Sequence, residues 1–381
     1  MKLNELLLSN NIYDYLIVGT GIFGSTVARL LKDRGYNVLV IEKKNHPGGN
    51  IYTEKIDDIT VHKYGAHIFH TDNQLVWEFV NKYAEMVPFI NSPIANYKGE
   101  LYHLPFNMNT FHELWGVTTP EEAKERIASE VANLNITNPS NLEEHILMMA
   151  GSSVYYKLVK DYTEKQWGRS CKELPASIIK RLPFRFEYNN NYFNDKYQGI
   201  PKGGYTLLIN NLLQDIDVIL ELDYLKYQKV LQKHANKIIY TGPIDEFYNY
   251  QEGHLEYRSL IFKTEKLNIN SYQGIPVMNF TSHNEDYTRI IEHKFFDKFC
   301  SNDKSTIITR EYPASYADTL NPYYPINDEK NNCIYQKYAL LAQKEKNVFF
   351  GGRLGLYKYF DMDDAIIAAF ELVEKITRKG I

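Results

Sequence analysis

The chain has 381 residues, 44% of them hydrophobic and 24% charged, which is an ordinary composition for a globular protein of two or three domains. Its formal net charge of −4 excludes a protein built mainly to neutralise nucleic-acid phosphates, and its three scattered cysteines indicate neither a disulfide framework nor a zinc site. Because the sequence also lacks an apolar run of about 20 residues and the features of a signal peptide, we expect a soluble protein of the reducing cytoplasm.

The first predicted elements are a strand, a glycine turn, a helix and a second strand. Residues 13–18 are apolar and rich in strand-forming residues, and residues 37–41 form a second such run that ends at Glu42. A strand-helix-strand unit of this kind places its two strands parallel in one sheet.

Helical spacing dominates the middle of the chain, and short strands return after it. The predicted helices are residues 75–83, 120–132, 141–160 and, near the end of the chain, 363–375. Asparagine, tyrosine and glycine are frequent from residue 184 to 205 and predict turns at a domain junction. The predicted strands of a mixed or antiparallel sheet are residues 237–240, 277–280, 289–292 and 306–309.

The glycine turn indicates a dinucleotide site. In Gly19-x-Gly21-x-x-Gly24 the first glycine allows a tight turn, the second lets the backbone approach a pyrophosphate, and the third lets the helix pack closely. Glu42 follows 18 residues after Gly24, where a carboxylate accepts hydrogen bonds from a ribose diol and repels a 2′-phosphate. The sequence therefore predicts FAD or NAD rather than NADP. A glycine turn that merely tightens packing would not need Glu42.

Two further segments favour FAD over NAD. Glu42-Lys43-x-x-x-x-Gly48-Gly49 is similar to the extension of the turn in glutathione-reductase-like FAD proteins. Gly351-Gly352-Arg353 is similar to the second flavin contact of those folds. Two remote segments that return to one cofactor predict a flavoprotein.

Long runs in the middle of the chain carry a more specific resemblance. They are HKYGAHIFHT (62–71), LPFNMNTF (104–111), YTEKQWGR (162–169), YTGPID (240–245) and YTRIIEHK (287–294). With these runs the sequence closely resembles the bacterial UDP-galactopyranose mutases over nearly the whole chain from Tyr13 onward.

The resemblance implies an α/β fold in which a Rossmann-like, glutathione-reductase-like FAD-binding domain is joined by a helical domain and an antiparallel β-sheet domain. We expect residues 1–82, 202–250 and 334–381 to form the FAD-binding domain, 83–180 the mainly helical domain, and 181–201 with 251–333 the sheet domain.

The resemblance also implies the reaction. The family interconverts UDP-galactopyranose and UDP-galactofuranose by ring contraction without net redox change, through a covalent intermediate between the sugar and N5 of reduced FAD. It further implies a cytoplasmic homodimer that supplies galactofuranose for cell-surface polysaccharide. The sequence does not identify the reductant: reduced nicotinamide is one candidate, and because the chain has a single dinucleotide fingerprint it would bind only transiently.

The resemblance assigns residues to substrate and cofactor. Arg181, Arg289 and His67 are the expected catalytic residues, and guanidinium groups suit a diphosphate because they stay charged and bind two oxygens at once. The expected substrate-binding residues are Asn91, Tyr162, Thr163, Trp167, Arg181, Tyr192, Arg258, Asn279, Arg289, Tyr323, Tyr359 and Asp361. The expected cofactor-binding residues are Gly19, Gly21, Phe23, Gly24, Glu42, Lys43, Gly49, Asn50, His67, Ile68, Val218, Gly352, Arg353, Tyr359, Asp361 and Met362.

Several of these residues also have ordinary structural explanations. A lone arginine is usually solvated, Tyr162 could belong to an apolar helix stripe, and Asp361 could cap a helix as well as contact the cofactor. His67 and His70 have the spacing of two metal ligands on a helix, but the flanking residues favour a loop and no carboxylate completes the set. We therefore predict no metal site. The resemblance places His67 beside the flavin and His70 nearer the sugar.

The sequence leaves two alternative functions possible and also predicts a mobile segment. One alternative is an FAD-dependent oxidoreductase of the same fold, and another is a flavoprotein that binds a nucleotide sugar without converting it. The polar stretch from Gly168 to Arg181 predicts a lid that closes when a diphosphate recruits Arg181.

Overall fold

The structure is a computed structural model that describes residue 6 and residues 11–134, 136–178, 183–319 and 321–378. Within this part of the chain, no helix has the length and apolar character needed to cross a bilayer.

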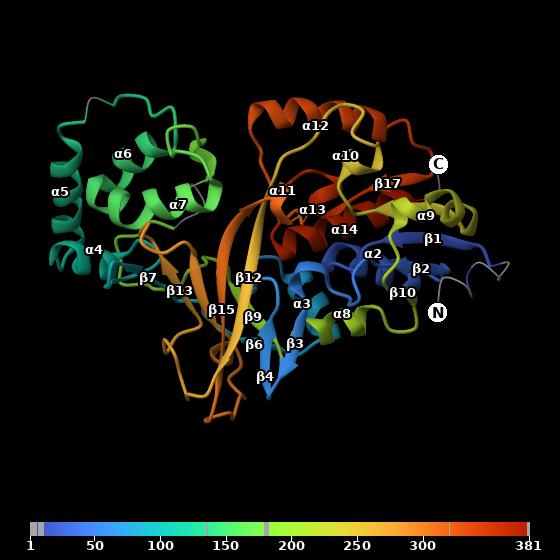
Figure 1. Cartoon of the computed structure of the whole chain (residues 1–381), viewed down its shortest axis with the longest axis horizontal. Coiled ribbons are helices and arrows are strands. Elements are labelled where there is room, and N and C mark those ends of the chain that lie inside the picture. The colour runs from blue at the N-terminus through green and yellow to red at the C-terminus, as the bar shows by residue number, and fades with distance from the viewer. Residues whose placement is uncertain (1–5, 7–10, 135, 179–182, 320, 379–381) are drawn as a thin grey trace.

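Five parallel strands form the sheet that carries the glycine turn. In spatial order they are β10 (Asp217–Ile219), β2 (Val38–Ile41), β1 (Tyr13–Val18), β11 (Ala235–Tyr240) and β17 (Val348–Phe350). Every neighbouring pair runs parallel, with β1 in the centre. Figure 1 shows this sheet on the side of the molecule where both chain ends lie.

Both faces of the parallel sheet are buried. Along β2, Val38 and Val40 point into one core and Leu39 and Ile41 into another, as the alternation of a strand requires. The first core is closed by α2 (Ile22–Asp33), α3 (Gln74–Tyr83), α8 (Tyr205–Leu212) and α14 (Met362–Thr377). The second is closed by α9 (Tyr224–Leu231). Burial on both sides explains why these strands are continuous apolar runs.

A smaller cluster packs beside the last strands. Its helices are α10 (Ile244–Phe247), α11 (Tyr316–Thr319), α12 (Glu329–Ala342) and α13 (Gly352–Gly355). Tyr338 of α12 is fully buried there and donates its hydroxyl proton to the Gly253 carbonyl, 2.6 Å away.

A second, seven-stranded sheet crosses the middle of the molecule. Its order is β16 (Tyr324–Pro325), β12 (Tyr257–Leu267), β15 (Thr306–Ser315), β14 (Arg289–Glu292), β13 (Val277–Phe280), β7 (Ile94–Tyr97) and β8 (Glu100–His103). All neighbours are antiparallel except β13 and β7. The long strands β12 and β15 stand between the parallel sheet and the helical end of the molecule (Figure 1).

Two small sheets lie beside these. One contains β5 (Phe69–Thr71), β9 (Tyr197–Pro201) and β6 (Met86–Pro88), and the other pairs β3 (Thr53–Ile56) with β4 (Ile59–His62).

Four helices gather at the far end of the molecule (Figure 1). They are α4 (Met108–Trp115), α5 (Pro120–Val131), α6 (Leu142–Val154) and α7 (Lys160–Trp167). The single helix predicted over residues 141–160 is wrong, because Gly151 interrupts α6 with φ 82° and a π-helical turn at Tyr155–Val159 precedes α7. Glu130 of α5 accepts the Ser153 N–H at 2.8 Å and so restarts the helix after the break.

Other sequence predictions also needed correction. The predicted loops at residues 184–205 contain β9, the central strand of the three-stranded sheet. Residues 237–240 belong to the parallel sheet and not to an antiparallel one, because β11 pairs with β1. Strands β7 and β8, from the range predicted to be mainly helical, join the seven-stranded sheet. Strand partners are set by contacts between distant segments, which a local pattern does not contain.

Three histidines, of which His62 and His293 are buried, are linked by hydrogen bonds. The His67 N–H donates to His62 Nδ1, and the His62 N–H donates to His293 Nδ1, both at 3.2 Å. His293 Nε2 lies 2.7 Å from Thr309 Oγ1. Burial lowers the pKa of His62 well below its usual value and that of His293 to about 3, so both imidazoles are neutral.

Acid should therefore destabilise the fold. An unfolded histidine has a pKa of about 6.5, so between pH 6.5 and about 3 the unfolded chain binds protons that the native chain refuses, at a cost of about 1.4 kcal/mol per pH unit for each such group. The stability is complete above pH 6.5 and is lost as the pH falls. We expect urea unfolding, measured from pH 7.5 to 4.5, to show that the free energy of unfolding falls less steeply with decreasing pH in His293→Gln. The difference in slope should correspond to about one fewer proton taken up on unfolding. The exposed His112→Gln is the control, and an equal slope in native protein and His293→Gln would refute the explanation.

Candidate functional site

A cavity opens at the carboxyl ends of β1, β2, β11 and β17, the edge where parallel sheets bind nucleotides. The predicted cofactor residues that line it are Gly19, Gly21, Phe23, Gly24, Glu42, Lys43, Gly49, Asn50, His67, Gly352, Arg353, Asp361 and Met362. Ile68 and Val218 pack in the core instead, and the lining near β10 comes from Leu222 to Leu225. Tyr359 lies against Arg353, with the guanidinium carbon 4.6 Å from the ring centre.

The three glycines of the turn have different surroundings. Gly19 has φ +105°, and a Cβ at Gly24 would lie 2.1 Å from the Gly19 carbonyl oxygen. A Cβ at Gly21 would meet no atom within 4 Å, so this position faces open space at the start of α2. The first turn of α2 carries no acidic residue, and its free N–H groups favour an anion.

Glu42 stands at the end of β2 with its carboxylate held in place. Its Oε2 accepts the Thr20 N–H at 3.0 Å and the Thr20 hydroxyl at 2.7 Å, while Oε1 accepts the Lys44 N–H at 3.0 Å. Glu42 therefore also braces the glycine turn, a structural role that the sequence did not reveal. Burial lowers the pKa of Lys44, another lining residue, to about 8.

His67 contributes a neutral imidazole to the cavity. Its Nδ1 lies 2.8 Å from the Gly65 carbonyl oxygen, which can only accept, so Nδ1 carries the proton and Nε2 keeps its lone pair. Burial, with the nearby charges of Arg353 and Arg289, lowers the pKa of His67 to about 4. His70 lies in β5 and stacks on Phe193 at 3.8 Å.

A row of polar side chains crosses the seven-stranded sheet. Asn279 of β13, Arg289 of β14 and Glu311 of β15 are directly opposite one another in register, so their side chains share one face. Arg289 Nε lies 3.5 Å from Glu311 Oε1, and both side chains are largely withdrawn from solvent. Burial raises the pKa of Glu311 and opposes the charge of Arg289, yet the attraction of Glu311 raises the pKa of Arg289 well above its usual value.

Tyrosines surround this cation. Arg289 donates to the Tyr162 hydroxyl of α7 at 2.8 Å. Tyr324 stacks on Tyr359 with ring centres 6.1 Å apart, and Arg353 lies 5.7 Å from the Tyr324 ring centre. Burial raises the pKa of Tyr192 to about 12, so its hydroxyl stays neutral beside Tyr162 and Arg289. The alternative explanation, that Tyr162 merely belongs to an apolar stripe of the helix, does not account for its hydrogen bond with Arg289.

The other predicted substrate residues lie around α7 and its supports. Thr163 is buried on α7, and Trp167 at the end of that helix packs against the helical core. Arg258 donates from Nε to the Gln166 carbonyl oxygen at 3.0 Å and so supports the end of α7. Asn91 accepts the Tyr192 N–H at 2.8 Å through its backbone carbonyl.

Besides Glu311 Oε1, which faces Arg289, three buried oxygen atoms near this row have no hydrogen-bond partner among the described residues. They are Asn91 Oδ1, Gln166 Oε1 and Asn279 Oδ1. Buried polar atoms are nearly always paired in folded proteins, so these acceptors are available to a ligand or to water.

Sequence reasoning missed Glu311 and Tyr324. Of the adjacent tyrosines it chose Tyr323, whose ring packs near Tyr64 and Phe262, whereas Tyr324 lies near Arg289 and Arg353. The only signal for Glu311 was a carboxylate in a run of strand-forming residues.

The predicted lid is anchored over its first part, and Arg181 lies outside the described residues. Arg169 pairs with Glu256 at 2.8 Å and with Asp328 at 3.0 Å. Cys171 is buried, and the Leu174 carbonyl accepts the Leu142 N–H at 2.9 Å. The segment is thus tied to its surroundings through Leu174.

Comparison with known proteins identifies the family. A family model described as UDP-galactopyranose mutase matches residues 157–359, and one described as an NAD(P)-binding Rossmann-like domain matches residues 17–83. A Klebsiella pneumoniae protein described as "Probable UDP-galactopyranose mutase" is 42% identical over 96% of this chain and 95% of its own length. The chain belongs to the UDP-galactopyranose mutase family. The enzyme class is therefore isomerase.

A second relative and a solved structure add to this comparison. An Escherichia coli relative described as dTDP-fucopyranose mutase is 39% identical over 94% of this chain and 97% of its own length. A solved structure of a reduced UDP-galactopyranose mutase superposes with a TM-score of 0.73 at 14% identity, over 96% of this chain and 93% of the other. At that identity the superposition shows the shared fold.

The lining of the cavity fits FAD, the cofactor expected for this family. The open position at Gly21 and the free N–H groups at the start of α2 suit a pyrophosphate. Glu42 lines the cavity at the position from which a carboxylate contacts the ribose in this type of site. At the other end His67 and Arg353 approach the polar row on the second sheet.

Gly21→Ala should separate cofactor binding from folding. Gly21 has φ −61°, which alanine adopts without strain, but the new methyl would occupy the space of the pyrophosphate. A clash of about 1–3 kcal/mol corresponds to about 5- to 150-fold weaker FAD binding. We expect fluorescence titration to show this loss and thermal unfolding of the apo-protein to be unchanged. Gly24→Ala should instead lower the unfolding temperature, and equal FAD affinity in Gly21→Ala would contradict the placement of the pyrophosphate.

Proposed function

We propose that this protein is a UDP-galactopyranose mutase that uses reduced FAD. The observation that supports this most is the partly buried Arg289, flanked by Tyr162 and the buried Glu311, beside a cavity that fits a flavin dinucleotide. The net reaction replaces O5 by O4 as the ring oxygen on C1 of the sugar, and no electrons are gained or lost.

Arg289 would bind the diphosphate of the nucleotide sugar. Its charge is maintained although it is partly withdrawn from solvent, because Glu311 and neighbouring tyrosine hydroxyls stabilise the cation. A dianionic diphosphate would supply a second partner to a guanidinium that holds its donors in a fixed plane. Arg181 is proposed to add the second cation.

The unpaired acceptors would orient the sugar and the base. Asn279 stands next to Arg289 in the sheet, and its Oδ1 can accept a hydrogen bond from a sugar hydroxyl or the uracil N–H. Asn91 offers a second such oxygen beside Tyr192. Tyr162 and Trp167 are proposed to provide aromatic faces for the nucleotide and the sugar.

His67 is proposed to tune the site without adding charge. Reduced FAD, when bound, supplies the nucleophile for the anomeric carbon as UDP leaves. The neutral imidazole adds no positive charge there, and its Nε2 can accept a hydrogen bond. Its ring position is set by the Gly65 carbonyl and its backbone by His62.

The relative described as a dTDP-fucopyranose mutase makes the corresponding reaction of dTDP-fucopyranose a second candidate. Both substrates carry a pyrimidine nucleoside diphosphate, so Arg289 serves either one. They differ in a base methyl, the ribose 2′-hydroxyl and the sugar 6-hydroxyl. The oxidoreductase alternative has less support, because oxidation of a small amine requires neither a buried arginine for phosphate nor the acceptors around it.

The deciding experiment is conversion of UDP-galactofuranose and of dTDP-fucofuranose by the purified protein, followed by chromatography with oxidised and with dithionite-reduced FAD. We expect UDP-galactopyranose to form only with reduced FAD and without net flavin oxidation. Faster conversion of the dTDP-sugar would favour the second candidate. Inactivity toward both while UDP still binds would refute both mutase proposals and favour a binding protein.

Glu311→Gln tests the diphosphate site. Removing one member of a buried ion pair costs roughly 3 kcal/mol, so the ligand-free variant should unfold at a lower temperature. UDP then supplies the missing negative charge, and we expect it to raise the unfolding temperature more in Glu311→Gln than in native protein. Glu265→Gln is the matched control, because Glu265 pairs with Arg310 in the same sheet but is exposed to solvent. It should change neither the unfolding temperature without ligand nor the increase caused by UDP appreciably. An equal UDP effect in Glu311→Gln and native protein would place the diphosphate away from Arg289.

The cell-surface glycan role, the cytoplasmic homodimer and the nicotinamide reductant rest on the family resemblance and stay predictions.

A further inference from the structure

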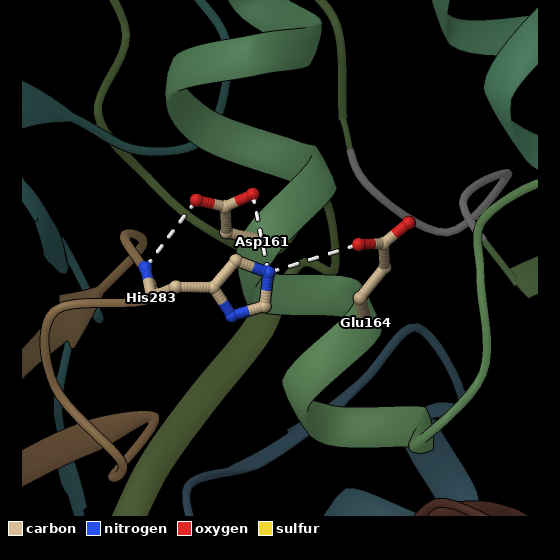
Figure 2. A group of neighbouring side chains, drawn as sticks. All are labelled: Asp161, Glu164 and His283. Atoms are coloured by element: carbon tan, nitrogen blue, oxygen red, sulfur yellow. Dashed lines mark hydrogen bonds and ion pairs between the residues drawn. The ribbon is translucent and has the colours of Figure 1, made fainter.

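Three side chains with metal-ligand atoms meet on the outer side of α7, away from the flavin cavity. Asp161 and Glu164 lie one turn apart on the helix, and His283 reaches them from the loop between β13 and β14 (Figure 2). Their ligand atoms all lie within 4.8 Å of one another. We propose that these residues bind a divalent transition-metal ion such as Zn²⁺.

Each carboxylate is oriented by a backbone donor that leaves one oxygen available. Asp161 Oδ2 accepts the His283 N–H at 3.3 Å, and Oδ1 faces the imidazole Nε2. Glu164 Oε1 accepts the Cys171 N–H at 3.2 Å, and Oε2 faces the same nitrogen. Outer contacts of this kind fix ligand directions in metal sites.

The distances fit ligands around an ion better than they fit a direct ion pair. His283 Nε2 lies 3.4 Å from Asp161 Oδ1 and 3.7 Å from Glu164 Oε2. Charge-assisted hydrogen bonds between nitrogen and oxygen are about 2.7–2.9 Å long. Ligands bound to Zn²⁺ at about 2.0–2.1 Å in a tetrahedron are separated by about 3.4 Å. An ion could thus be enclosed with small side-chain movements.

The loop that carries His283 is held firmly, so its position does not depend on an ion. The Nζ atom of Lys165 on α7 lies 2.9, 2.7, 3.0 and 3.0 Å from the carbonyl oxygens of Phe280, Ser282, Glu285 and Tyr287, which share its three N–H donors. Thr281 donates its hydroxyl proton to the Lys157 carbonyl at 2.7 Å. A preformed site costs less ordering entropy on binding.

The donor set and exposure indicate the class of ion. The Asp161 and Glu164 side chains are 18% and 19% exposed, whereas His283 is 54% exposed, so the carboxylates are shielded and the entrance is open. One imidazole and two carboxylates suit Zn²⁺ and its first-row neighbours, while Mg²⁺ prefers oxygen ligands alone. Three protein ligands leave at least one coordination position for water.

An ion at this position would join α7 to the loop that leads into Arg289. Tyr162 follows Asp161 directly and receives a hydrogen bond from Arg289, so both sides of the contact would be tied together by the ion. Because an ion that binds only the folded chain stabilises it by mass action, Zn²⁺ should raise the unfolding temperature.

The test is calorimetric titration of the chelator-treated holoenzyme, prepared without a polyhistidine tag, with Zn²⁺, and visible spectroscopy with Co²⁺. We expect one high-affinity Zn²⁺ per chain, an increase in unfolding temperature, and no effect of Mg²⁺ at the same concentration. His283→Gln and Asp161→Asn should each weaken Zn²⁺ binding about 100-fold or more, because loss of even an outer partner costs about 10- to 100-fold.

His103→Gln is the matched control, since His103 pairs with the single carboxylate of Glu113 at 2.5 Å on another surface. It should leave Zn²⁺ binding unchanged. If a variant proves unstable without metal, Glu164→Gln and the Co²⁺ spectrum provide the same comparison. Absence of saturable binding, or equal affinity in His283→Gln and native protein, would overturn the proposal.

Discussion

The charge of Arg289 is the constraint on which the site depends. A guanidinium partly withdrawn from water needs negative or strongly polar partners, and here these come from two other elements, β15 and α7. Register places Glu311 opposite it on β15, while Tyr162 reaches it from α7 in the helical part of the molecule. Holding one cation in place therefore fixes the helical end against the seven-stranded sheet, and Lys165 secures the same junction from behind.

The cofactor cavity meets a different constraint, which is close approach of the backbone. Gly24 must lack a side chain for the helix to pack, whereas Gly21 must lack one for a ligand to enter. Beside the polar row, Asn91, Gln166 and Asn279 carry buried side-chain oxygens that have no hydrogen-bond partner among the described residues. Open space and unpaired acceptors at the site lower the stability of the fold. The two hydrophobic cores packed on the faces of the parallel sheet compensate for this loss.

Features that depend on residues close together in the chain could be predicted from the sequence, whereas features that depend on distant residues could not. The glycine turn and Glu42 lie within one short unit, so they could be predicted from local pattern and spacing. The break at Gly151 could not, because Glu130 of a neighbouring helix caps the restarted helix. Glu311 and Tyr324 acquire their roles from strand register, and His283 joins Asp161 only because a loop folds across α7. The family resemblance supplied the candidate site residues but not the contacts that position them.

The same logic explains why the reaction is easier to infer than the exact substrate. A buried arginine recognises any nucleoside diphosphate, and the uridine and thymidine sugars present the same one. A pocket rejects an extra methyl group by only about 10- to 200-fold, whereas a site built to hydrogen-bond a hydroxyl rejects its absence by about 10⁴- to 10⁵-fold. Discrimination between the two substrates should therefore come from the unpaired oxygens of Asn91, Gln166 and Asn279, which a missing ribose or sugar hydroxyl would leave unsatisfied.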